Sequence, residues 1–152
     1  MLTEMIKKYL VILIVLVIIF LVFYFLVKQG IANRKIIKIR VKDQVIEAVV
    51  SDTPIALAKG LGGTESIEDN EGMLFVFKSP RKTSFWMDGM KFPLDIIWIS
   101  KGKIAYIARN IPVDFKEIVN PSISTDKVLE INAGLSDKYG ISINDDVKFN
   151  SR

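Results

Sequence analysis

Residues 85–99 read FWMDGMKFPLDIIWI, and this stretch decides the fold. From Phe92 onward, apolar side chains fall on both sides of an alternating pattern, which predicts a strand over 92–99. Because both faces are apolar, we expect the strand to be covered on both sides. Asp95 is the one carboxylate in this strand. A buried carboxylate must find hydrogen-bond donors or bear a large desolvation cost, so Asp95 is the first residue to explain.

Asp95 has two interpretations. In the structural one, which we favour, backbone N–H groups hold it, or it pairs with Lys59 or Arg109. In the functional one, it is the polar anchor of a pocket walled by Trp86 and Met87. We expect Trp86 at a surface turn, next to Asp88 and Gly89. The candidate pocket residues are Asp95, Trp86, Met87, Asp88 and Lys59.

Outward from this stretch, short apolar runs are separated by turn residues. Thr53 followed by Pro54 predicts the start of a short helix that ends near Leu61, ahead of two glycines. A further helical turn is expected over 134–139. We expect strands over 37–41, 45–50, 72–77, 83–87, 92–99, 103–108, 128–133 and 147–149, with Ser79-Pro80 breaking the third. This pattern predicts a small α+β domain with a mostly antiparallel, β-rich sheet, and it allows a partly closed barrel.

The N-terminal part predicts a membrane span. From Tyr9 to Val27 the chain has no charge and no helix breaker, and all residues except Tyr9 and Tyr24 are Leu, Ile, Val or Phe. As a helix this segment is about 28 Å long, close to the hydrocarbon thickness of a bilayer. A cleaved signal peptide is the main alternative, but its apolar core is normally shorter, and Gly30 and Ala32 make a poor cleavage site. We therefore favour a retained single-pass anchor whose partner is the lipid bilayer.

A basic tract from Lys28 to Lys42 follows the span without an intervening acid. Counting positive charges places the following domain in the cytoplasm, although folded domains translocate largely regardless of charge. In the cytoplasm this tract would be attracted to anionic lipid. A solvated strand edge explains it equally well. Nucleic acid is a poor partner because no aromatic residue is interleaved with the basic ones.

The composition excludes several classes of site. The chain has no cysteine and no histidine, so disulfides, Cys/His zinc sites, cysteine nucleophiles and histidine-based triads are absent. Acidic clusters at 68–71 and 144–146 carry oxygen ligands, but neither has EF-hand spacing. We interpret both as solvated loops and assign no metal, cofactor or catalytic residue.

Several motifs together resemble the domain-of-unknown-function 192 family. They are GLGG (60–63), GMLFVF (72–77), FWM with PLDI (85–96), VLEINAG (128–134) and GISINDDV (140–147). The chain departs from the family pattern in having Lys59 in place of an arginine, Gly62 in place of a methionine and Asp88 at the start of a usual Lys-Asn-Thr. The resemblance implies a β-rich α+β domain, often exported or membrane-anchored, with no settled activity. It favours an extracytoplasmic location.

The predicted organisation is therefore an anchored binding or interaction domain for an unknown protein or small ligand. Glu130, flanked by Leu129 and Ile131, is expected to face solvent or pair with a lysine. One alternative is a hydrolase of a cell-surface polymer, which pairs Asp95 with Asp88 or Glu130. Another is a membrane scaffold that acts through 9–27. The predicted segments are a flank 1–8, the span 9–27, a basic linker 28–35, the domain 36–149 and a tail 150–152.

Overall fold

The computed structural model describes residues 2–32 and 35–150 of the 152-residue chain. The chain divides into two units, 1–34 and 35–152. The first contains helix α1 (Leu2–Ala32), in which Met5–Phe25 has a mean hydropathy of 2.9. The predicted span lies within this helix. The predicted linker at 28–35 is helical as far as Ala32, and residues 33–34 lie outside the described part.

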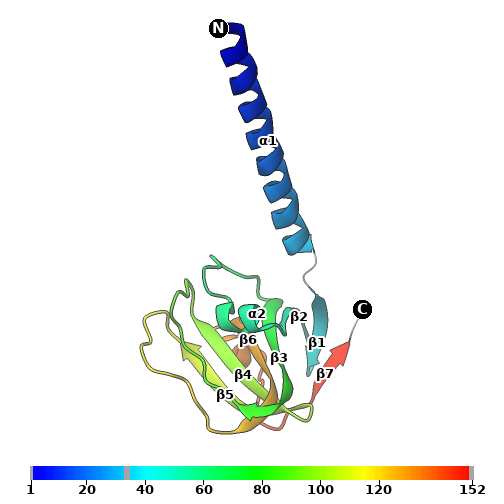
Figure 1. Ribbon diagram of the computed structural model, residues 1–152. Helices are drawn as coiled ribbons and strands as arrows, with labels where there is room; N and C mark the ends of the chain where they lie inside the picture. Colours follow the sequence, from blue (N-terminus) through cyan, green and yellow to red (C-terminus); the bar gives the residue numbers. More distant parts are fainter. Residues whose placement is uncertain (1, 33–34, 151–152) are drawn as a thin grey trace. The chain divides into compact units, whose positions relative to one another are not determined.

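The second unit is a seven-stranded sheet in the order β5-β4-β6-β3-β2-β1-β7 (Figure 1). Neighbouring strands are antiparallel except for the parallel pair β2–β3. The sheet curls until its two ends meet, where Ile104 N–H donates to the Asp145 carbonyl at 3.0 Å. The expected α+β fold with a partly closed barrel is thus confirmed. The elements are β1 (Ile36–Val41), β2 (Gln44–Ser51), α2 (Pro54–Lys59), β3 (Glu71–Lys82), β4 (Leu94–Ser100), β5 (Lys103–Ile111), β6 (Ser124–Asn132), α3 (Leu135–Lys138) and β7 (Val147–Asn150).

Helix α2 begins as expected from its sequence. The Thr53 hydroxyl accepts a hydrogen bond from Ala56 N–H at 3.3 Å, and Pro54 occupies the first turn. Gly60 ends the helix with a φ of 53°, a backbone conformation that favours glycine. The chain then turns directly onto the sheet. Phe75 would lie only 3.3 Å from a Cβ added at Gly60, so a side chain there would crowd the contact.

Two strand predictions are wrong. Ser79-Pro80 does not break β3, which continues to Lys82 because a register shift between Val76 and Arg81 accommodates the proline. The predicted strand 83–87 is an extended segment with one bridge, in which Phe85 and Val119 exchange hydrogen bonds of 3.0 and 2.8 Å. This segment therefore lies over the sheet, where it covers a face instead of joining the ladder.

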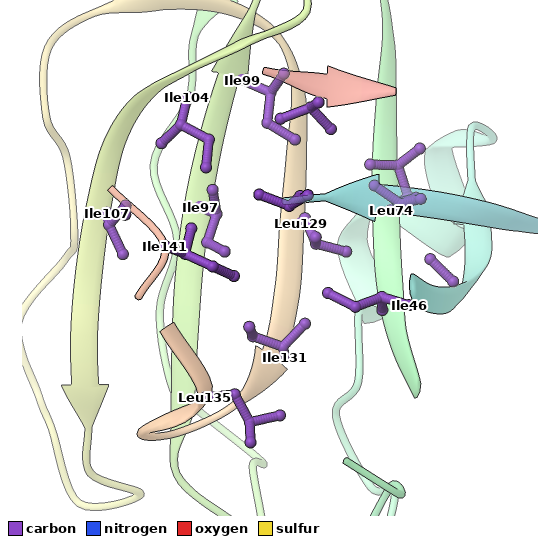
Figure 2. Close-up of a cluster of buried hydrophobic side chains, with 14 residues drawn as sticks. Ile46, Leu74, Ile97, Ile99, Ile104, Ile107, Leu129, Ile131, Leu135 and Ile141 are labelled. Carbon is purple, nitrogen blue, oxygen red and sulfur yellow. The ribbon is translucent and has the colours of Figure 1, made fainter. Parts of the chain in front are cut away.

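Both faces of the central strand β4 are buried, as its sequence predicts. Ile97 and Ile99 point into a core inside the curled sheet, where Leu129, Ile131 and Leu135 join them (Figure 2). Ile96 and Trp98 point into a second core on the opposite face, together with Phe75, Phe85 and Val128. Both cores are built from the second unit alone, so the segment from Lys35 onward has what it needs to fold on its own.

Candidate functional site

Asp95 is a buried structural carboxylate. It is completely inaccessible to solvent and accepts three backbone hydrogen bonds. Its Oδ1 accepts from Asn110 N–H at 2.7 Å and from Gly134 N–H at 3.2 Å. Its Oδ2 accepts from Ser136 N–H at 2.8 Å. Asp95 therefore ties the end of β5 and the start of α3 to β4, and its side chain is satisfied without a ligand.

The groups proposed to pair with Asp95 lie elsewhere. The Arg109 guanidinium donates to the Asp137 carboxylate at 2.8 Å and to the Ile141 carbonyl at 2.7 Å. Glu130 is opposite Ile96 in the sheet, whereas Asp95 is opposite Ile131. Successive residues of a strand point to opposite faces, so the sheet separates the Asp95 and Glu130 carboxyl groups. A hydrolytic pair of these two side chains would not share one cleft.

A cavity of about 640 Å³ lies on the Glu130 face of the sheet. One wall comes from the end of α2 and the loop after it, another from β3, and a third from the segment after β3 that lies over the sheet. Its apolar surface includes Leu57, Phe75, Phe77, Phe85 and Trp86. Cavities of this size and lining are typical of small-molecule sites.

Glu130 is on the lining of this cavity and is only 5% exposed, which contradicts the expectation that it faces solvent or pairs with a lysine. Its Oε2 atom has no hydrogen-bond partner in the described part of the chain. Burial raises the pKa of this carboxyl from 4.5 to about 8. At neutral pH Glu130 is therefore an uncharged acid, able to donate a hydrogen bond to a ligand in the cavity.

The predicted pocket residues divide between two places. Trp86, Asp88 and Lys59 line the cavity, and Trp86 is 55% exposed. Met87 is buried in the core below it, and Asp95 is on the other face of the sheet. Three of the five predicted residues thus lie together on the cavity lining, and the carboxyl that reaches this lining is that of Glu130. The burial of Glu130 could have been predicted from Val128. The two residues share one face of the strand, and the apolar Val128 side chain implies that this face is covered.

The two acidic clusters are occupied by protein groups. Glu71 accepts a hydrogen bond from Glu68 N–H, and Asp69 pairs with Lys138 at 2.8 Å. Asp145 pairs with Lys42 at 3.2 Å, and Asp146 with Lys103 at 2.7 Å. Over 2–32 and 35–150, no group of three His, Cys, Asp or Glu residues is placed to hold a metal ion.

Of the basic tract, the side chains of Lys28 and Arg34 lie outside the described part. Lys38 forms an ion pair of 3.0 Å with Glu47 on β2, as a charge on an exposed strand surface often does.

Comparison with known proteins agrees with the fold. The family model of DUF192, described as "Uncharacterized ACR", matches residues 36–149. A crystal structure of a proposed transcription regulator from Sinorhizobium meliloti has a TM-score of 0.71 and 24% identity, covering 77% of this chain and 94% of that one. A protein of unknown function from Novosphingobium aromaticivorans has a TM-score of 0.69 and 30% identity, covering 74% of this chain and 83% of that one. No curated protein gives a significant match.

Proposed function

We propose that this chain, which belongs to the DUF192 family, is a single-pass membrane protein whose β-rich domain binds a small organic molecule outside the cytoplasm. The observation that carries the binding function is the buried, unpartnered Glu130 carboxyl on the lining of an apolar cavity. Leaving such a group unsatisfied costs about 1–3 kcal/mol. A ligand that accepts a hydrogen bond from this acid would recover that cost.

Three features support the membrane part of the proposal. The segment Met5–Phe25 is long and apolar enough to cross a bilayer, and none of it is buried by the described part of the chain. A signal sequence has the same features, but this one lacks a good cleavage site. The family resemblance favours the extracytoplasmic side. The positive charges after the span favour the cytoplasm, but folded domains translocate largely regardless of charge.

The binding function can be tested with Nile red, a neutral dye whose emission rises in apolar surroundings. We expect one dye molecule to bind the domain of residues 35–152. Ala58→Trp, which adds bulk to an exposed residue on the cavity wall, should abolish this signal. Ile55→Trp is the matched control, since Ile55 is on the same helix but is 84% exposed and outside the cavity lining. Equal dye binding by both variants would overturn the proposal.

The location can be tested with protease added to intact cells that produce the full chain with a C-terminal epitope. We expect the epitope to be lost without permeabilisation, and the membrane fraction of untreated cells to contain the uncleaved chain. Protection in intact cells, followed by digestion after permeabilisation, would place the domain in the cytoplasm. A shortened chain in the soluble fraction would show that the apolar helix is a cleaved signal.

A further inference from the structure

Three cations line the cavity without an acidic partner. Lys59, Arg81 and Lys82 contribute to its wall, and none of the three forms an ion pair with any residue in 2–32 or 35–150. The Arg81 guanidinium instead stacks on the Phe77 ring at 4.5 Å. Asp88 is the only other charged group on the lining at neutral pH. The cavity therefore has an excess of positive charge that an anion would neutralise.

The Glu130 end of the cavity is chemically different. The carboxyl is close to the turn after α2, with its Oε2 3.8 Å from where a Cβ at Gly60 would stand. Burial raises its pKa, and no nearby cation offsets that increase. Arg81 is opposite Thr125, five residues along β6 from Glu130, so the Arg81 part of the lining is separated from this carboxyl along the sheet. The site has a cationic region and a separate hydrogen-bond donor.

Apolar surface connects these two polar ends. Leu57, Phe75 and Phe85 contribute to the lining, and all three belong to or pack against the core on this face of the sheet. Trp86 adds an exposed ring. Aromatic and aliphatic walls of this kind hold the hydrocarbon body of a ligand while a few polar groups fix its orientation.

We propose that the cavity binds an amphipathic organic anion. Its acidic head group contacts Lys59 and Arg81, and its apolar body lies against the aromatic wall. A neutral oxygen at its far end accepts a hydrogen bond from Glu130. This inference rests on the proposed binding function and specifies the class of ligand. A free organic acid and the acidic head of a lipid share this chemistry.

Four probes that share a ten-carbon chain test the proposal on residues 35–152. The probe 9-oxodecanoate has both an anion and a carbonyl acceptor, decanoate lacks the acceptor, 2-decanone lacks the anion, and decyltrimethylammonium carries a cation. Trp86 lines the cavity, whereas Trp98, the other tryptophan, is fully buried outside the lining, so a fluorescence change on binding should come from Trp86. The variant Trp86→Phe should remove the response and so establishes its origin.

We expect 9-oxodecanoate to bind about tenfold more tightly than either decanoate or 2-decanone, since each loses one polar contact. Decyltrimethylammonium should bind more weakly than any other probe. If 2-decanone or the cation binds as tightly as 9-oxodecanoate, the anionic class is wrong, although Nile red binding would still support the proposed function. If Nile red and all four probes fail to bind, the proposed function fails as well.

Substitutions of the basic side chains test whether they bind the acidic head group. Arg81→Gln and Lys59→Gln change exposed side chains, so the fold should persist, and each should weaken 9-oxodecanoate binding about tenfold. Lys116→Gln, another exposed lysine but outside the lining, is the matched control and should leave affinity unchanged. Equal affinity in all three variants would overturn the cationic end.

The Glu130 end is tested by pH. For the wild-type domain, 9-oxodecanoate affinity should fall as pH rises through about 8, because the ionised carboxyl cannot donate to the ketone. In Glu130→Gln the amide remains a donor, so affinity should change little over this range. If the affinities of the wild type and Glu130→Gln depend on pH in the same way, the hydrogen bond from Glu130 to the ligand is refuted. Phosphatidylglycerol vesicles distinguish the two sources of the acidic head group. If the vesicles displace 9-oxodecanoate, the ligand is a lipid; if 9-oxodecanoate stays bound, the ligand is a free organic acid.

Discussion

Replacing Glu130 with glutamine should remove a pH-dependent penalty on folding. Burial raises the pKa of this carboxyl from 4.5 to about 8. The unfolded chain therefore releases the proton near pH 4.5, whereas the folded domain retains it until the pH approaches 8. Between these values the folded state binds more protons, so the free energy of unfolding falls as pH rises. Below pH 4.5 both states are protonated and the penalty disappears.

The size of the effect follows from the interval between the two pKa values. The penalty grows by about 1.4 kcal/mol for each pH unit. The interval from 4.5 to about 8 is about 3.5 units, so by pH 8 the wild-type domain should lose about 5 kcal/mol that Glu130→Gln does not lose. The buried amide of glutamine has its own desolvation cost, but that cost does not vary with pH.

Urea denaturation of residues 35–152 at pH 4 to 9 measures this difference. We expect the stability of Glu130→Gln relative to wild type to rise steadily between about pH 5 and 8 and to level off outside that range. Glu117→Gln, at an exposed glutamate, is the control and should parallel the wild type at every pH. A Glu130→Gln curve that also parallels the wild type would refute the account of a protonated, buried acid.

Three other substitutions test the surroundings of the site. Asp95→Asn should lower the free energy of unfolding, measured in urea, by about 2–4 kcal/mol, because the new amide would face backbone N–H donors. The affinity for 9-oxodecanoate should stay unchanged. A loss of affinity without a loss of stability would contradict the structural role of Asp95. Gly72→Ala should lower Tm sharply, since its Cβ would lie 2.6 Å from the Glu130 carbonyl oxygen; an unchanged Tm would count against this packing. Thr83→Val should cost about 1–3 kcal/mol by removing the acceptor of the Trp98 indole N–H, and chemical denaturation that detects no loss would argue against that bond.

The central strand was predictable because its own residues contain the information. Alternation from Phe92 to Ile99 places apolar side chains on both faces, and both faces of β4 pack into cores. The helix start at Thr53-Pro54 is equally local. The course of β3 was not predictable in this way. Whether Pro80 ends a strand depends on whether its partner can shift register, and that is decided by β6.

The site was harder to predict because its parts are distant in the sequence. The sequence predicts a buried Asp95, but its three donors come from the end of β5 and from the start of α3. The prediction that Glu130 faces solvent or pairs with a lysine rests on the large apolar neighbours that flank it. A polar residue between two apolar ones indicates an exposed face only if no other part of the chain covers the face that carries the polar residue. Here α2 and the segment after β3 cover it, leaving the cavity between.

The pairing of β1 with β7 has a consequence for biosynthesis. β1 is the first strand to leave the ribosome, and β7, which pairs with it from Val41 to Lys38, is the last. Until β7 leaves the ribosome, the outer edge of β1 remains a free template for other strands. The domain can therefore be completed only after β7 has left the ribosome. A message truncated shortly before Val147 would yield a product that displays this edge to chaperones and proteases.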